Sequence, residues 1–407
     1  MTIRSMIKRW WKTFKWVTKY PNISTGMRVH VFFDYLSLYR KKGLTHDEYK
    51  DFEFEKQSDE FRQTFLGLNE QRYYLDYLNP IKYYSLARNK YLTHKILENT
   101  GVRKAELYCY YQPEGKVIES NEIANSLFDV CRILKAKNVT ECVVKPTESS
   151  HGNNVYLVTH LEYETDDCKL ILFNNEVIKL SDILGRNPII FESVIKQTTQ
   201  FSAFNSSSVN TIRFMTVLYP DGKAHMAGIW MKFGREGRCV DNAGSGGNID
   251  ACVDIATGEI KYVTEFNGWR KTKVITHHPD SGALLEGVKI DDWENIVAQV
   301  LNFQECFPYV KAAGWDIAIT DDGPVVIEVN DFWDRTGQFF IRRGWRNEIR
   351  DCYLAWRSYW DMGIVSERQI HESNNLLTSE GKEYNLCRQP NSLSIDHLRK
   401  IVVHEYE

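Results

Sequence analysis

The chain has 407 residues, 43% hydrophobic and 26% charged, a composition typical of a globular protein with more than one domain-sized unit. Its 51 basic and 54 acidic residues give a net charge of −3, so no overall basic excess indicates a nucleic-acid partner. The nine cysteines are scattered and form no CxxC pair, and no apolar run is long enough to span a bilayer. Lysines interrupt the first residues, where a secretory signal would need an apolar run. We therefore expect a cytoplasmic protein without a secretory signal.

The first twenty residues predict a basic amphipathic helix that ends before Pro21. Its apolar residues recur at helical spacing: Ile3, Ile7, Trp10, Phe14 and Val17. Most of its lysines and arginines fall elsewhere on the helix. Two interpretations remain open. Residues 1–20 either contact the inner face of a membrane or a glycosyltransferase, or pack on the body of the protein with their lysines in water.

The chain from about residue 30 to 88 also has a helical pattern, and we expect residues 1–88 to form a helical N-terminal region. The spacing predicts helices over 29–42, 45–52 and 56–78, and Asn79-Pro80 interrupts the pattern. The stretch ARNKYLTHKILENTGV then predicts an amphipathic helix with Gly101 as its C-cap.

After Gly101, short β-branched and aromatic runs separated by Gly, Asn and Asp predict strands. These runs are ELYCYY, ECVVKP, NVYLVTH, KLILF, PIIFESVI and NTIRFMTVLY. Helical segments over 121–136 and 290–307 alternate with them, so we expect an α+β core. From Arg342 the pattern is helical again (RNEIRDCYLAWRSYW), followed by a polar tail.

The most informative stretch is residues 314–331, GWDIAITDDGPVVIEVND, which reads as a β-hairpin. Glu328 and Asn330 lie two apart on its second strand and therefore share a face. A three- or five-residue turn centred on Asp322 places Asp316 opposite Glu328 on that face, whereas a two-residue Asp-Gly turn points Asp316 away. Clustered oxygen ligands suit Mg²⁺ held together with substrate phosphates, with Mn²⁺ as a substitute. The alternative is an exposed polar sheet face.

Two other segments carry charged residues at strand ends. In VVKPTESSHGNNVYLV, Lys145 precedes a flexible loop with Ser150 and Gly152 whose amides can bend over phosphate oxygens; the alternative is a lysine that merely reaches solvent. In PIIFESVIKQ, Glu192 interrupts an apolar strand that leads into a linker. Such a linker can pair its backbone with an adenine edge, but this segment alone favours a solvated glutamate at a strand edge.

Two cationic residues stand on the strands that follow. Arg213 in VNTIRFMTVLY and Lys232 in AGIWMKFGREG lie among apolar neighbours, and a guanidinium on a core strand needs anions nearby. A second glycine-rich loop, VDNAGSGGNI, contains Asn242. Either these are edge charges and turn residues, or Arg213 and Lys232 act in catalysis and Asn242 binds a cofactor.

Taken in this order, the motifs resemble the ATP-grasp superfamily, closest to its sugar-transfer-associated branch in cell-surface polysaccharide biosynthesis, over roughly residues 85–340. The resemblance implies two α+β subdomains (89–190 and 191–341) that enclose an ATP cleft, with a helical tail over 342–407. RNKYLTHKILENTGV supplies Lys90 and CVVKP supplies Lys145 as ATP lysines, with SSHGNNV as the flexible loop. FESVI matches the adenine hinge at Glu192 and the Val194 backbone, and Gln197 is a ribose contact.

The same resemblance places Arg213 at the reacting phosphate and Asp316, Glu328 and Asn330 at the metal. It implies a carboxylate–amine ligase that forms an acyl phosphate from ATP and acts on a small-molecule carboxylate, preferably a carboxylated sugar or amino acid, and an amine. A kinase on the same fold and a non-catalytic adaptor are the alternatives, and the retained charged residues argue against the adaptor. Family members often begin with a Rossmann-like domain; the helical start found here leaves the substrate open.

Overall fold

The computed structural model describes residues 3–115, 120–148, 154–238, 247–268 and 270–359. They form two compact units. The helical unit comprises the chain up to Leu78, Tyr219–Asp221 and the chain from Asp334. The sheet unit comprises Asn79–Leu218 and Gly222–Trp333. The mixed α+β architecture with a helical N-terminal region is confirmed, although the units divide after Leu78 and Trp333 rather than at 88 and 341.

The helical unit contains short and medium helices and one 3₁₀ turn. They are α1 (Ile3–Thr18), α2 (Thr25–Lys42), α3 (His46–Asp51), η1 (Phe54–Lys56), α4 (Asp59–Thr64), α5 (Leu68–Leu78), α12 (Gly337–Phe340) and α13 (Arg346–Tyr359). The single helix predicted over 56–78 is wrong. Ser58 caps α4 by accepting from the Phe61 N–H, and the chain leaves the helix at Phe65, whose buried ring packs on Phe52 and Phe54. Burial of Phe65 outweighs the local helical pattern.

Buried polar contacts join the two ends of the chain within the helical unit. Arg346 of α13 donates to Glu70 of α5 at 2.8 Å, and both side chains are buried. The side-chain amide of Gln338 accepts from the backbone N–H of Leu66 and donates to its carbonyl. Because buried polar groups must be paired, these contacts fix the segment after Asp334 on the N-terminal helices.

The first sheet of the sheet unit has the strand order β2-β1-β7-β3-β4-β5-β6. Its strands are β1 (Leu107–Tyr111), β2 (Ile123–Ala124), β3 (Cys142–Pro146), β4 (Tyr156–Tyr163), β5 (Cys168–Leu172), β6 (Val177–Lys179) and β7 (Ile189–Glu192). Helices α8 (Leu127–Ala136) and α9 (Leu180–Ile183) pack on this sheet, whereas η2 (Ile81–Tyr83), α6 (Tyr84–Arg88) and α7 (Lys90–Leu97) precede it in the chain, and Ala87 of α6 and Leu97 of α7 belong to the core of the second sheet. Helix α7 ends at Leu97, so the prediction that Gly101 is its C-cap is wrong; Gly101 (φ 75°) lies in the following turn.

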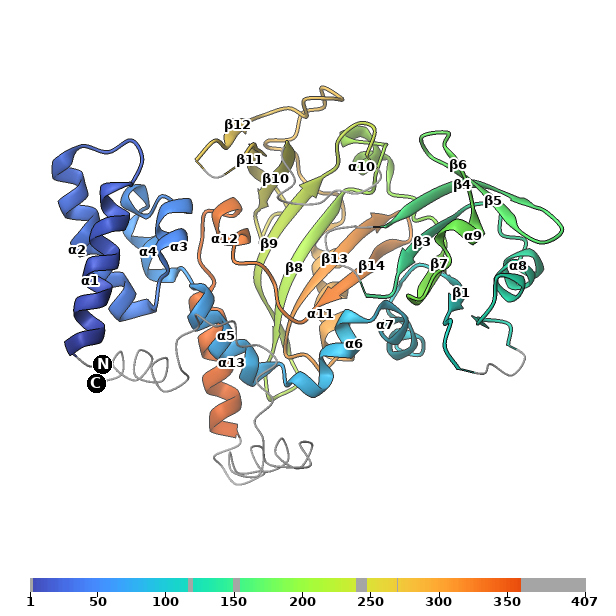
Figure 1. The fold of residues 1–407 in the computed structure, drawn as a ribbon, viewed down its shortest axis with the longest axis horizontal. Coiled ribbons are helices and arrows are strands. Elements are labelled where there is room, and N and C mark those ends of the chain that lie inside the picture. The colour runs from blue at the N-terminus through green and yellow to red at the C-terminus, as the bar shows by residue number, and fades with distance from the viewer. Residues whose placement is uncertain (1–2, 116–119, 149–153, 239–246, 269, 360–407) are drawn as a thin grey trace. The chain divides into compact units, whose positions relative to one another are not determined.

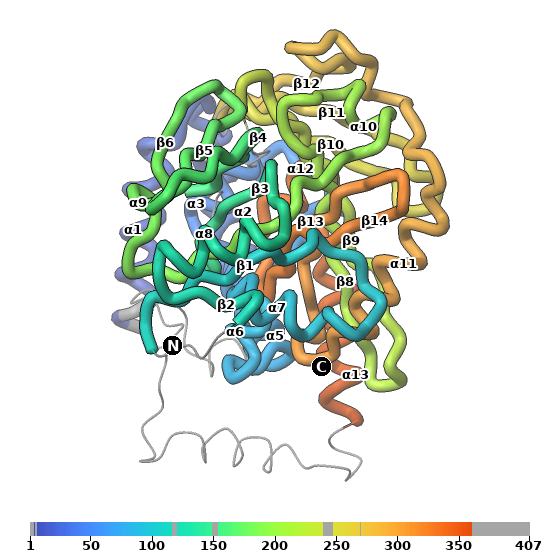
Figure 2. Tube along the Cα trace, turned by 90° about the vertical axis from the view of Figure 1, so that its right-hand side faces the viewer, coloured from blue at the N-terminus to red at the C-terminus, as the bar shows by residue number. Residues whose placement is uncertain are grey.

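The second sheet has the order β12-β11-β10-β9-β8-β13-β14. Its strands are β8 (Thr211–Leu218), β9 (Ala224–Phe233), β10 (Asn248–Val253), β11 (Ile260–Phe266), β12 (Lys273–Ile275), β13 (Ala312–Thr320) and β14 (Gly323–Asn330), and its helices are α10 (Thr199–Phe204) and α11 (Trp293–Cys306). Figures 1 and 2 both place β3 of the first sheet next to the β13–β14 hairpin.

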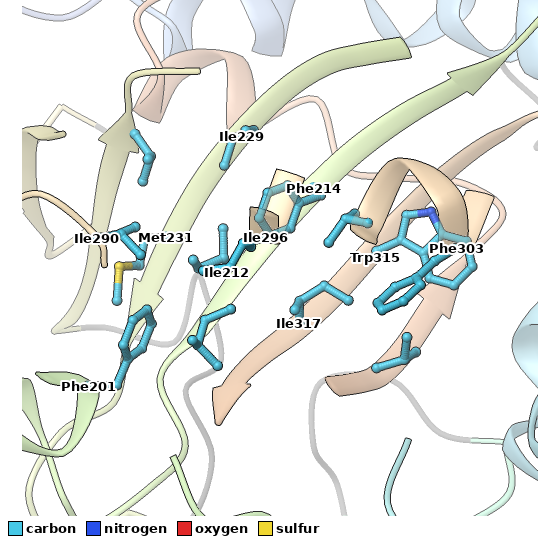
Figure 3. Packing of buried hydrophobic residues seen from close by; sticks show 14 of the residues in the cluster. Phe201, Ile212, Phe214, Ile229, Met231, Ile290, Ile296, Phe303, Trp315 and Ile317 are labelled. Atoms are coloured by element: carbon cyan, nitrogen blue, oxygen red, sulfur yellow. The ribbon is translucent and has the colours of Figure 1, made fainter. Parts of the chain in front are cut away.

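One face of the second sheet packs against α11 and forms the main core. Figure 3 shows its side chains, among them Ile212, Phe214, Met231, Ile296, Phe303 and Trp315. Since side chains alternate along a strand, the residues between these core positions point to the opposite face. That opposite face carries Arg213 on β8, Lys232 on β9 and Asp316 on β13. The packing of one face therefore fixes where the charged residues of the other face lie.

Candidate active site

A cavity of about 410 Å³ lies between the two sheets, within the size range of small-molecule sites. Its lining comes from β3, β4 and β7 on one side and from β8, β9, β13 and β14 on the other, joined by the linker after β7. Most of the residues singled out in the sequence line it: Lys90, Lys145, Glu192, Val194, Gln197, Lys232, Asp316 and Glu328.

A buried carboxylate with two nitrogen partners, Lys145 and His94, lies on the β3–β7 side of the cavity. The Glu192 carboxylate is 2.5 Å from the Lys145 ammonium and 2.5 Å from Nε2 of His94. Burial alone raises the pKa of Glu192, but the charge of Lys145 and the hydrogen bonds from His94 and Lys145 lower it to about 2. Because β7 lies between β1 and β3, the expectation of a solvated glutamate at a strand edge is wrong.

His94 is the functional candidate that the sequence analysis missed. It follows Lys90 by four residues on α7, and residues four apart share a helix face, so the spacing contained the signal. Its Nε2 contacts Glu192, while its buried Nδ1 has no hydrogen-bond partner among the described residues. His94 thus orients the carboxylate that holds Lys145.

A second ionic cluster lies on the face of the other sheet. Arg213 donates to both oxygens of Asp316 at 2.6 Å, and the Lys232 ammonium donates to Oδ1 at 2.9 Å. Burial raises the pKa of the Asp316 carboxyl, but the charges of Arg213 and Lys232 hold it well below its ordinary range. The guanidinium also lies over the Trp230 ring, 5.4 Å from its centre. This cluster therefore presents two oriented cations beside one carboxylate.

The hairpin brings Asp316 opposite Glu328, as predicted, but its turn length and strand pairing differ from those expected. Thr320 pairs with Gly323, so the turn has only the two residues Asp321 and Asp322. The pairing then shifts between Ile317, which pairs with Val326, and Asp316, which pairs with Glu328. A bulge at Ile327 thus supplies the extra residue, and the predicted longer turn is wrong.

The remaining metal and lysine candidates occupy different positions. Asn330 is the strand partner of Gly314, and its side-chain amide donates to the Gly314 carbonyl at 3.4 Å. Asn330 is not among the residues that line the cavity.

Lys90 is buried in the cavity wall. Burial lowers the pKa of its ammonium, and the nearby charge of Glu328 partly offsets this effect. Both Lys90 and Glu328 line the cavity, so the Glu328 charge acts on the Lys90 ammonium there.

The linker from Ser193 to Gln197 forms another wall of the cavity. Glu106 and Ser193 exchange hydrogen bonds that anchor its start. Among the described residues, the backbone N–H groups of Val194 and Lys196 have no hydrogen-bond partner. The side-chain amide of Gln197 is already engaged: it donates to the Asn205 carbonyl at 2.8 Å and accepts from the backbone and side chain of Asn210. Gln197 thus fixes the 205–210 loop, and a ribose contact would compete with these bonds.

Three further candidates, Ser150, Gly152 and Asn242, lie outside the described residues. Arg213 does not itself line the cavity but holds Asp316, which does.

In the described part of the chain, no group of three or more His, Cys, Asp or Glu side chains is placed to hold a metal ion. Of the described helices, none has the length and apolar character needed to cross a membrane.

A protein-family model described as sugar-transfer associated ATP-grasp matches residues 69–351. The comparison with curated proteins gave no match. Among solved structures, the D-alanine–D-alanine ligase from Bacillus anthracis is 14% identical at a TM-score of 0.35, over 68% of this chain and 70% of that one.

Two carboxylase structures also match, each across about half of its own length. The biotin carboxylase from Campylobacter jejuni is 9% identical (TM-score 0.38), over 66% of this chain and 46% of that one. The biotin carboxylase domain of the Hydrogenobacter thermophilus 2-oxoglutarate carboxylase is 12% identical (TM-score 0.35), over 63% and 45%.

Proposed function

The chain belongs to the sugar-transfer associated ATP-grasp family, and we propose that it is an ATP- and Mg²⁺-dependent ligase that joins a carboxylate to an amine. One observation carries the proposal: a single cavity collects Lys90, Lys145 and the linker at Val194 from one sheet region and the Asp316–Glu328 pair from the other. Cations, carboxylates and unpaired amides around one apolar-walled cavity match the chemistry of a nucleoside triphosphate.

The residues of the first sheet are assigned to the nucleotide. Val143 and Leu157 pair across β3 and β4 and give the cavity an apolar wall that suits a purine face. The N–H groups of Val194 and Lys196 are donors available for its polar edge. The ammonium groups of Lys145 and Lys90 supply positive charge for phosphate oxygens. Glu192, kept ionised, fixes the position of Lys145, and the resemblance adds Ser150, Gly152 and Asn242 to this half.

The residues of the second sheet are assigned to the metal and the reacting phosphate. Asp316 accepts three hydrogen bonds, and a carboxylate has about four lone-pair positions, so one remains for a cation. With Glu328 opposite it on the same face, the donor set fits Mg²⁺, which favours one or two carboxylates plus phosphate oxygens. Asn330 completes the proposed set. When bound, Mg²⁺ neutralises charge on the phosphates.

The proposed reaction uses these residues for positioning and charge neutralisation. A substrate carboxylate oxygen attacks the γ-phosphorus of ATP, the bond to the β-phosphate oxygen breaks, and ADP and an acyl phosphate form. The amine then attacks the acyl carbon, loses a proton and expels inorganic phosphate. Lys232, which lines the cavity, holds the transferred phosphoryl group, and Arg213, bound to Asp316 of the lining, adds positive charge beside it. We propose a carboxylated sugar or amino acid as the acid, in cytoplasmic steps of cell-surface polysaccharide biosynthesis.

A labelled-oxygen experiment tests this proposal and separates it from a kinase. The full chain is incubated with ATP, Mg²⁺ and a panel of ¹⁸O-carboxylate-labelled uronic and amino acids, each with and without an amine. A ligase transfers one ¹⁸O to inorganic phosphate and forms an amide only when the amine is present. A stable phosphorylated product that forms equally without amine would assign the protein to the kinases instead.

Contact with a glycosyltransferase or a membrane through residues 1–20 is a separate part of the proposal and does not depend on the ligase chemistry.

A further inference from the structure

Among the described residues, seven of the thirteen exposed large apolar side chains lie on the first two helices. Ile7, Trp11 and Phe14 of α1 are 64%, 58% and 52% exposed, and Phe33 of α2 is 60% exposed. Trp10, Met27 and Val29 are exposed as well. Such a cluster of exposed large apolar side chains marks an interaction site.

Helix α1 has three separate faces, since successive residues are about 100° apart. One face is buried in the helical unit through Thr13 and Val17. The adjacent face carries the exposed apolar side chains. The third face is basic and exposed: Arg4, Lys8, Lys12 and Lys15. The inner face therefore already has its partner, and the outer apolar face is an additional surface.

The apolar face continues from α1 onto α2, which lies beside it (Figure 1). The Trp10 ring meets the Phe32 ring edge-on at 5.9 Å, and Phe32 in turn contacts Phe33 at 5.2 Å. Arg28 of α2 donates to the Val17 and Thr18 carbonyls at the end of α1, which fixes the two helices together. The surface is thus a rigid two-helix platform, wider than the residues 1–20 considered from the sequence.

The charge of this platform identifies its partner. Seven lysines and arginines occur before the first acidic residue of the chain, Asp34. A second copy of the same face would bring two basic surfaces together, which is unfavourable. Aromatic side chains flanked by lysines match the interface of a bilayer with anionic headgroups. We propose that the α1–α2 platform binds the surface of an anionic phospholipid membrane, with Trp11, Phe14 and Phe33 inserted among the lipids.

Vesicle flotation with the full chain tests this proposal. We expect the protein to float with vesicles of equal parts phosphatidylcholine and phosphatidylglycerol but not with phosphatidylcholine alone. Flotation should weaken as ionic strength rises from about 0.1 to 1 M, where the Debye length falls from about 10 to 3 Å. Lys8→Gln, Lys12→Gln and Lys15→Gln together should lower partitioning roughly a hundredfold, at about fivefold per charge.

The double variant Trp11→Ser/Phe14→Ser should lower partitioning at least about tenfold. Its matched control is Phe128→Ser, which removes a side chain that is 72% exposed on α8 of the sheet unit and should float as the wild type does. Thermal melting and ATP binding of both variants show that the fold and the nucleotide site are intact, so failure of this inference is separate from failure of the ligase proposal. Wild-type protein that stays unbound, or a double variant that floats fully, would overturn the inference. Loss of wild-type self-association in the double variant without any flotation would assign the platform to a second copy and overturn it too.

Discussion

Replacing Asp316 with Asn removes a buried negative charge that pairs with both Arg213 and Lys232. Asp316 is buried and accepts from the two cations at 2.6, 2.6 and 2.9 Å. Breaking a buried ion pair by removing one partner costs about 3–5 kcal/mol. Because Asp316 and Lys232 border a cavity that admits water, we expect the lower end, about 3 kcal/mol. Asp316→Asn should therefore lower the local stability of β8, β9 and β13.

Hydrogen–deuterium exchange measures this effect strand by strand, without requiring the whole chain to unfold in one step. About 3 kcal/mol corresponds to exchange roughly a hundredfold faster in β8, β9 and β13 of the variant. Asp321→Asn is the matched control, because Asp321 lies exposed in the turn of the same hairpin. ATP without Mg²⁺ should restore part of the protection by supplying phosphate anions to the two cations. Exchange within about threefold of the wild type would refute the assignment of Asp316 as their shared partner.

Three further predictions concern groups with defined partners. Glu192 is held at a pKa of about 2 against an ordinary 4.5, so the unfolded chain binds more protons between these values. The stability of the sheet unit should therefore fall as the pH drops through this window. Hydrogen–deuterium exchange of β7, measured from pH 5 downward, should show this pH dependence in the wild type and lose it in Glu192→Gln. Burial and then the charge of Lys12 lower the pKa of His46 to about 4, so the helical unit should lose stability as pH falls from 6.5 to 4. Thermal melting should show this loss, and His46→Gln should remove it. Gln197→Ala frees the 205–210 loop and should weaken ATP binding about tenfold in calorimetry, whereas Gln200→Ala, whose side chain bonds Lys289 and Asp291 on the surface, should not.

The alternation of side chains along strands made the hairpin predictable. Glu328 and Asn330 share a face because of their spacing, and a three- or five-residue turn centred on Asp322 placed Asp316 opposite Glu328. The turn length was not predictable, because a short turn with a bulge gives the same pairing as a longer turn. The choice depends on the packing of Val326 and Val329 in the core, which the local sequence does not contain.

The environment of Glu192 could not be read from its own segment. Its strand looks the same whether it lies at the edge or in the middle of a sheet, and only the pairing of β7 with β1 and β3 buries it. His94 was accessible from its spacing to Lys90, but a histidine on a helix has many roles until its partner is known. The break at Phe65 likewise required knowledge of the tertiary core.

The most direct test of the account is calorimetric titration of the full chain with ATP in the presence of Mg²⁺. We expect one binding site, and Lys145→Met should weaken ATP binding about tenfold to a hundredfold because a charge-assisted contact to phosphate is lost. Lys135→Met, on the exposed side of α8, is the matched control and should bind as the wild type does. Absence of ATP binding by the wild type, or equal affinity of the two variants, would contradict the assignment of this cavity as the nucleotide site.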